Sequence, residues 1–153
     1  MTDNFIYPEA TAKFTAGAYA AGQIVGGNIL FPIKGRTWDI SGGLLLSLSV
    51  LDNDLEGAPG TLYLFQGKIG NYADRTLFDN VITYADMKKN FYEVTMGTFS
   101  TYAQLKRFRE PKINTGFQLL DNVNTITGLF RTSGTPSYAL GKELCFILGI
   151  LPE

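Results

Sequence analysis

The fold class is indicated most directly by the stretch GLLLSLSVL, residues 43–51. Every even-numbered position in this stretch is apolar, while Ser47 and Ser49 interrupt the odd-numbered positions, which also hold Leu45 and Leu51. Alternation with a period of two residues is typical of a β-strand with one buried face. The stretch therefore predicts a strand whose even-numbered side chains lie in the core. These side chains are Leu44, Leu46, Leu48 and Val50.

Similar runs recur along the chain. Residues 61–66 alternate in the same way, and residues 142–151 place Leu144, Phe146, Leu148 and Ile150 on one face. Further strands are expected at residues 22–33, 91–99, 102–109, 116–120 and 125–132. With 17 glycines and 6 prolines in the chain, this pattern predicts an all-β, jelly-roll-like β-sandwich of about eight strands. One short helix is expected around residues 84–89, with Thr83 as its N-cap.

Composition limits the classes of partner. A chain of 153 residues is the size of one domain, and 45% of its residues are hydrophobic, which excludes a disordered chain. Only 18% are charged, less than the roughly 25% of an average soluble domain, so we expect a partner to cover part of the surface. The net charge of −1 argues against a nucleic-acid partner. No apolar run is long enough for a membrane span, and the N-terminus does not resemble a signal peptide.

The residues needed for most catalytic and metal sites are missing. The chain has no histidine and a single cysteine, which excludes imidazole-based triads and cysteine-rich zinc sites. Asp52, Asp54 and Glu56 alternate after the strand at residues 43–51, but they lack the spacing of a calcium-binding loop and are interpreted as a solvated turn. Cys145 is interpreted as an inert buried thiol. We expect no catalytic activity, no cofactor and no required metal.

Several other residue groups are given structural interpretations. Gly22, Gly26 and Gly27 lack the Lys-Ser/Thr ending of a phosphate-binding loop and are expected to allow close approach of the backbone. Trp38 is expected to pack under a hairpin of residues 35–43 or at an interface. The basic clusters are expected to be solvated or to contact an acidic protein rather than single-stranded nucleic acid. They are Lys88, Lys89, Lys106, Arg107, Arg109 and Lys112.

The first 18 residues differ from the rest of the chain. Pro8 and Gly17 discourage a helix or a central strand, so residues 1–18 are interpreted as an extended N-terminal arm and residues 19–153 as the sandwich domain. A frayed terminus is the alternative. The arm is rich in apolar side chains that a solvated tail seldom carries. The candidate contact residues are Phe5, Ile6, Tyr7, Phe14 and Tyr19. Deleting residues 1–14 is expected to leave the sandwich folded.

Two ends of the chain carry a resemblance to a known family. The run YAAGQIVGG at residues 19–27, with GTPSYA at 134–139 and LCFILGIL at 144–151, resembles the capsid decoration, or cement, proteins of tailed bacteriophages, which are head auxiliary proteins. The resemblance implies a β-sandwich on the outer surface of an icosahedral head. It also implies a homotrimer, the major capsid protein as partner, and no catalytic residues. The protein would be made in the host cytoplasm and located on the virion, where the arm would contact the capsid or neighbouring subunits.

Two alternatives remain open. The same sandwich could belong to another structural component of a virion, such as a head-fibre base or a tail-associated protein. It could also be a carbohydrate-binding β-sandwich module or a small β-sandwich enzyme.

Overall fold

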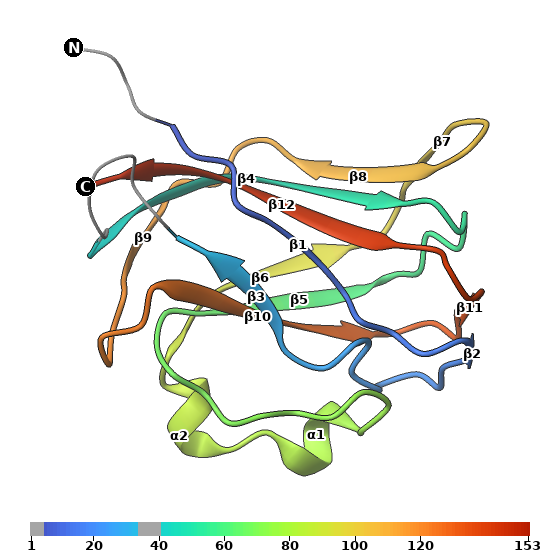
Figure 1. The fold of residues 1–153 in the computed structure, drawn as a ribbon, viewed down its shortest axis with the longest axis horizontal. Coiled ribbons are helices and arrows are strands. Elements are labelled where there is room, and N and C mark those ends of the chain that lie inside the picture. The colour runs from blue at the N-terminus through green and yellow to red at the C-terminus, as the bar shows by residue number, and fades with distance from the viewer. Residues whose placement is uncertain (1–4, 34–40) are drawn as a thin grey trace.

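Two antiparallel sheets form the body of the protein in the computed structural model, which describes residues 5–33 and 41–153 (Figure 1). The six-stranded sheet contains β1 (Glu9–Thr11), β12 (Leu144–Pro152), β4 (Gly42–Asp52), β8 (Lys106–Glu110) and β7 (Ser100–Thr101) in that order, with β9 (Thr115–Gln118) also paired to β4. The four-stranded sheet contains β3 (Ile29–Pro32), β10 (Thr125–Thr132), β5 (Gly60–Phe65) and β6 (Asn90–Met96). A small third sheet pairs β2 (Gly17–Ala18) with β11 (Ser137–Tyr138).

The chain crosses repeatedly between the two large sheets. It passes from β1 to β3, β4 and β5 in alternate sheets, and later from β9 to β10 and on to β12 in the same manner. Side chains from both inner faces meet in one core, in which Phe130 and Phe146 pack edge to face with ring centroids 5.8 Å apart. The prediction of an all-β sandwich is confirmed. Its finer jelly-roll form stays a prediction.

Strand β12 agrees with the sequence pattern, whereas β4 departs from it in its first half. Leu144, Phe146, Leu148 and Ile150 of β12 are all buried, as predicted. In β4 the register opposite β12 shifts, because Ser47 lies opposite Gly149 whereas Leu45 lies opposite Ile150. Leu46 is therefore the extra residue of a β-bulge. The bulge turns Leu45 into the core, while Leu44 and Leu46 are only half-buried, so the prediction that these two belong to the core was wrong.

The middle of the outer face of the four-stranded sheet is covered by the segment between β5 and β6, while outward side chains of its edge strands β3 and β6 are exposed. This segment contains α1 (Phe78–Val81) and α2 (Tyr84–Met87), which Figure 1 shows on the side away from the six-stranded sheet. A second hydrophobic cluster lies under it, formed by Ile24, Phe65, Ile69, Tyr72, Phe78 and Leu129. Thr83 caps α2 by accepting a hydrogen bond from the Asp86 backbone N–H, as predicted. The sequence did not predict α1.

The two helices have four residues each. Within residues 5–33 and 41–153, no helix has the length and apolar character needed to span a membrane. Trp38 and most of its predicted hairpin lie outside the described residues, so its predicted packing stays a prediction.

Residues 22–33 do not form one strand. Only Ile29–Pro32 is a strand, preceded by single bridges at Gln23 and Ile24. Gly26 and Gly27 have φ angles of 82° and 69°, in the left-handed region that favours glycine. A Cβ at Gly26 would lie 2.8 Å from the Lys13 backbone nitrogen, and one at Gly27 would lie 2.7 Å from the Tyr72 carbonyl oxygen. These glycines bring three chain segments together, as the structural interpretation expected.

The described part of the predicted arm is integrated into the sandwich. Strand β1 pairs with the edge of β12, and the Ile6 and Ile150 backbones form a bridge. Ala12 and Tyr19 both belong to the main core, so residue 18 does not separate two packing units. A deletion of residues 1–14 would expose core surface and leave β12 at the edge of the sheet. We therefore now expect this deletion to destabilise the fold, contrary to the sequence-based expectation.

Candidate binding surfaces

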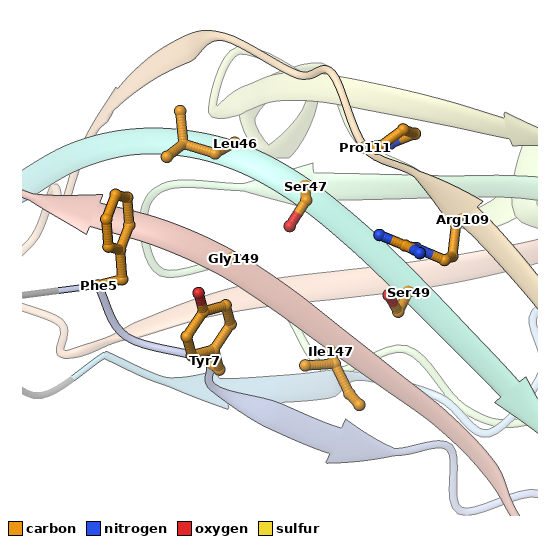
Figure 2. A pocket seen from close by; sticks show the side chains of 9 residues that line it. All are labelled: Phe5, Tyr7, Leu46, Ser47, Ser49, Arg109, Pro111, Ile147 and Gly149. Atoms are coloured by element: carbon orange, nitrogen blue, oxygen red, sulfur yellow. The ribbon is translucent and has the colours of Figure 1, made fainter.

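A groove crosses the outer face of the six-stranded sheet (Figure 2). Its volume is about 350 Å³, and it is open to solvent along the sheet. Its walls and floor come from the chain before β1 and from β12, β4 and β8. The lining residues are Phe5, Tyr7, Leu46, Ser47, Ser49, Arg109, Pro111, Ile147 and Gly149.

The β-bulge in β4 gives the groove its shape. Because Leu46 is the extra residue, both Leu46 and Ser47 line the outer face, where a regular strand would present only one of them. Gly149 lies opposite Ser47 on β12, and a side chain there would collide with Ser47 Oγ. The added Cβ would also lie 3.6 Å from the ring of Tyr7. The missing side chain of Gly149 therefore leaves room for the hydroxyl on one side and the aromatic ring on the other.

One wall of the groove is aromatic and the other is cationic. The side chains of Phe5 and Tyr7 are 43% and 65% exposed. Arg109 projects from β8 on the far side and is exposed. Figure 2 shows its guanidinium directed toward Ser47 and Ser49. No carboxylate is among the lining residues.

A second surface lies at the end of the sandwich where β4 meets its following loop. Three loops there each carry an exposed apolar side chain: Leu55 is 40%, Tyr102 47% and Leu140 90% exposed. The first and last of these loops are joined, since the Ala139 N–H donates to Asp54 Oδ2 at 2.7 Å. The β7–β8 turn adjoins them, because a Cβ at Gly57 would meet Lys106 Cδ. We call Leu55, Tyr102 and Leu140 the loop-end residues.

Leu140 is the most exposed of these three side chains, and a tight turn presents it. The Lys142 N–H donates to the Ala139 carbonyl at 3.3 Å, which closes a four-residue turn. Gly141 has a φ of 80°, as required at the third position of a type II turn. Leu140 stands at the second position, held outward by backbone that is bonded on both sides. Because the backbone of this turn is already ordered, a partner that covers Leu140 does not have to order the loop.

Three of the five predicted arm contacts are structural. Ile6 and Phe14 are half-buried, and Phe14 stacks on Tyr138 with centroids 4.4 Å apart. Tyr19 is 2% exposed, and its hydroxyl donates to Asp74 at 2.8 Å. Burial, together with that hydrogen bond, raises the pKa of Tyr19. Only Phe5 and Tyr7 of the predicted set present large exposed side chains.

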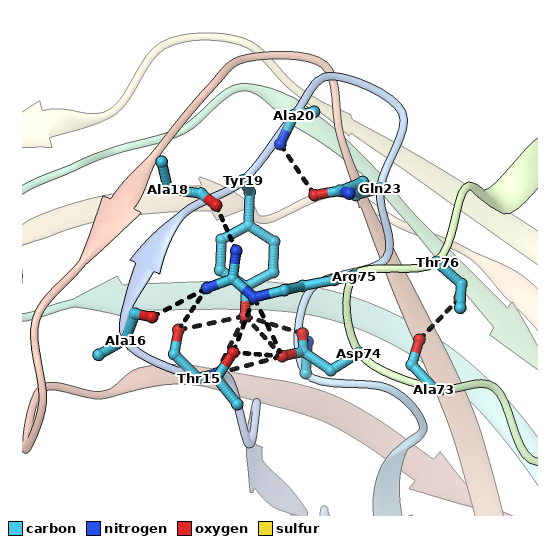
Figure 3. Close-up of polar contacts among 11 residues, drawn as sticks. Thr15, Ala16, Ala18, Tyr19, Ala20, Gln23, Ala73, Asp74, Arg75 and Thr76 are labelled. Atoms are coloured by element: carbon cyan, nitrogen blue, oxygen red, sulfur yellow. Dashed lines mark hydrogen bonds and ion pairs between the residues drawn. The ribbon is translucent and has the colours of Figure 1, made fainter.

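Asp74 and Arg75 fasten the arm to the segment that covers the four-stranded sheet (Figure 3). Asp74 Oδ1 accepts the Gly26 N–H at 2.7 Å, and Oδ2 accepts the Thr15 hydroxyl at 2.8 Å. The Arg75 guanidinium lies 4.0 Å from the centre of the Tyr19 ring. It also donates to the backbone carbonyls of Thr15, Ala16 and Ala18. These polar contacts are internal, so we assign them to the fold and not to a ligand.

The acidic turn after β4 is more buried than predicted. Asp52 is fully buried, and its carboxylate accepts the N–H groups of Asp54 at 2.9 Å and Gly57 at 2.8 Å. Burial raises the pKa of the Asp52 carboxyl, and these hydrogen bonds only partly oppose that effect. Its interpretation as part of a solvated turn was wrong, because the carboxylate organises the loop from inside. Within the described residues, no group of three or more acidic or cysteine side chains could hold a metal ion.

Cys145 lies on the outer side of β12, between the buried Leu144 and Phe146. It is half-buried and not part of the core, which corrects the prediction of a buried thiol. Burial is nevertheless the largest effect on its pKa, which is raised. A raised pKa leaves little thiolate at neutral pH, so the side chain is poorly suited to act as a nucleophile.

Another hollow, of about 400 Å³, lies beside α2 and is lined in part by Tyr72, Thr83 and Asp86. Its polar groups bind one another. Tyr72 donates its hydroxyl hydrogen to Asp86, which also accepts the Gly70 N–H at 3.1 Å. Burial alone would raise the pKa of Asp86, but these hydrogen bonds outweigh it and the pKa is lowered. The carboxylate thus serves to hold the covering segment in place.

Sequence reasoning did not single out the residues that shape the groove. Ser47 and Ser49 were expected to face outward, and Arg109 belonged to a basic cluster, but nothing in the sequence placed them beside Tyr7. The one available signal was the break of the leucine pattern at the serines. Comparison with protein families and with curated proteins found no match.

Proposed function

We propose that this protein is a structural component of a virion that binds the outer surface of a tailed-phage head and stabilises the shell. In this proposal it acts as a homotrimer whose partner is the major capsid protein. The observation that carries the proposal is the loop end, where adjacent loops expose Leu55, Tyr102 and Leu140. Isolated apolar side chains are normal on a surface, but several on one end are typical of protein–protein contacts.

The site chemistry also supports a binding role. The buried or half-buried carboxylates Asp52, Asp74 and Asp86 are engaged in hydrogen bonds with neighbouring parts of the fold. The single cysteine has a raised pKa, and the chain has no histidine. Such an inventory suits a protein whose contribution is surface contact.

The mechanism is linkage between binding and assembly. A subunit that contacts two capsid subunits at once binds the assembled shell and not the separated subunits, so mass action favours the assembled form. Standard interfaces bury roughly 1,600 Å² in total, and an icosahedral head repeats the contact many times. Each contact can therefore be modest while the stabilisation of the shell is large.

Co-sedimentation with phage heads that lack this protein tests the proposal. The intact chain should sediment with the heads and raise the temperature at which they open. The triple variant Leu55→Ser, Tyr102→Ser, Leu140→Ser should remain folded and lose most of its binding. The matched variant Phe5→Ser, Tyr7→Ser changes two exposed aromatic residues elsewhere and should bind as the intact chain does. If the intact chain does not bind the heads, the proposed function is wrong. If only the Phe5→Ser, Tyr7→Ser variant loses binding, the contact is made by the arm and not by the loop end.

A further inference from the structure

The groove on the six-stranded sheet presents a positive charge without an internal partner. The ion pairs found among the described residues involve Arg75, Lys89 and Arg131, and none involves Arg109. Glu9 lies on the same sheet and in the same cross-strand row as Arg109. Two residues of this row, Ile147 on β12 and Ser49 on β4, lie between them. Three strand spacings amount to about 14 Å, too far for an ion pair. The groove therefore suits a ligand that brings its own negative charge.

The floor of the groove offers hydroxyl groups and little backbone. β4 pairs with β12 on one side and with β8 or β9 on the other, so its backbone groups bond to neighbouring strands. A peptide that binds by adding a strand needs a free sheet edge, and the centre of the sheet provides none. Ser47 and Ser49 are half-buried residues that line the groove, and neither side-chain hydroxyl forms a hydrogen bond within the described part of the chain. They remain able to donate to and accept from a ligand.

The aromatic wall completes the chemistry. The ring of Tyr7 lies over Gly149, as the 3.6 Å approach to its virtual Cβ shows, and 65% of the side chain remains exposed. A tyrosine combines an apolar ring with a polar tip, and such residues favour ligands that are apolar on one face and polar at the edge. A sugar ring has this character, because C–H groups line its faces and hydroxyls its rim. A volume near 350 Å³ is at the small end of ligand sites, which span roughly 300–1,000 Å³.

We propose that this groove binds a sugar that carries a carboxylate, such as a uronic or sialic acid residue. The carboxylate pairs with the Arg109 guanidinium, whose planar donors match it in bidentate fashion. The ring lies against Tyr7, with Phe5 at its end, and the ring hydroxyls bond to Ser47 and Ser49. This site goes beyond head decoration. It lies on a different surface from the loop-end residues, so either function can hold without the other.

Amide chemical-shift titration of the full chain provides the test. The probes are digalacturonate and sialyllactose, with neutral galactobiose and lactose as matched sugars and hexaglutamate as an acidic polypeptide. At least one acidic sugar should shift the amides of Ser47, Ser49 and Gly149. It should bind at least about tenfold more tightly than its neutral counterpart, since a charge-assisted hydrogen bond is lost in the latter.

Two substitutions sharpen the result. Arg109→Gln should weaken the acidic sugar by about tenfold or more and leave the neutral sugar unchanged. Arg107→Gln is the matched control, because Arg107 lies on the same strand but does not line the groove, and it should weaken the acidic sugar clearly less than Arg109→Gln does. The proposal is overturned if neither acidic sugar shifts these amides, if neutral sugars bind equally well, or if Arg107→Gln has the larger effect. Tighter binding of hexaglutamate would also overturn it and identify the occupant as an acidic polypeptide.

Discussion

The two sheets share one core but differ on their outer faces. The segment between β5 and β6 covers the middle of the outer face of the four-stranded sheet, where Phe65 and Leu129 are buried beneath it and Tyr63 stacks on Phe78 at 4.4 Å, while Leu30 at the β3 edge stays exposed. The outer face of the six-stranded sheet holds the groove, which is lined by serines and an arginine together with apolar side chains of β4 and β12, and only the chain before β1 lies along one edge of it. The covered face contributes stability, whereas the bare face is available for ligands. Measurements that compare the two faces can therefore separate structural from functional residues.

The largest effect is expected from removing the segment that borders the bare face. Deleting residues 1–14 removes β1, its hydrogen bonds to β12 and the buried Ala12. The loss of unfolding free energy, measured in urea, should exceed that of every substitution below. Lys13→Ala changes an exposed side chain in the same segment and should stay within about 0.5 kcal/mol of the intact protein. An equally stable truncated chain would show that the arm is separable, as the sequence alone indicated.

The covered face should be sensitive to truncation in its second core. Phe65 is fully buried there, so Phe65→Ala should lower the unfolding free energy by about 3–5 kcal/mol. Ile147→Ala on the bare face is the matched change, and it should cost about 1 kcal/mol because Ile147 is only half-buried. Similar losses at the two sites would show that the bare face is covered in solution.

These two faces also show what the sequence could predict. β12 and α2 were predicted correctly because a strict alternation and a Thr83 cap are local signals. The bulge was hidden, since Leu44, Leu45 and Leu46 are all leucine and look alike on either face of a strand. α1 was missed because no side chain caps its N-terminus.

The groove could not be predicted, for a related reason. It combines Tyr7, the bulge at Leu46 and Gly149, which come from distant parts of the chain and meet only through strand pairing. Exposed aromatic residues near the N-terminus were recognised as candidates. The sequence could not show which of these side chains pack inside the fold. Their burial depends on contacts such as the hydrogen bond between Tyr19 and Asp74, which are 55 positions apart.

A smaller effect is expected where the covering segment is tied to the arm. Asp74→Ala removes the acceptor of the Tyr19 hydroxyl and of the Gly26 N–H, so it should lower the unfolding free energy by about 1–3 kcal/mol. The control Asp79→Ala removes an exposed ion pair, in which Asp79 Oδ2 lies 2.9 Å from a guanidinium nitrogen of Arg131. It should lower the unfolding free energy by about 0–1 kcal/mol. If thermal unfolding gives the reverse order, the arm is not fastened through Asp74.

The smallest effect is expected from a pH-dependent contact beneath the covering segment. The pKa of Asp86 is lowered from 3.8 because hydrogen bonds to its carboxylate, chiefly from Tyr72, outweigh the opposing effect of burial. The ionised group therefore stabilises the fold above pH 3.8, and this contribution disappears as the pH falls through the folded-state pKa. Asp86→Asn should lower the unfolding free energy by about 1 kcal/mol at pH 7 and by less in acid. Urea unfolding at pH 7 and at pH 3 measures this difference between the intact protein and the variant. A difference of the same size at both pH values would contradict the role given to the Asp86 carboxylate.

The most direct test of the central claim is a cryo-electron microscopy reconstruction of phage heads prepared with and without this protein. Binding through the loop end predicts additional density on the outer surface of the head, into which the sandwich fits with Leu55, Tyr102 and Leu140 toward the shell. The groove beside Tyr7 and Arg109 would then remain open to solvent. Identical reconstructions, or density confined to the tail, would contradict the claim.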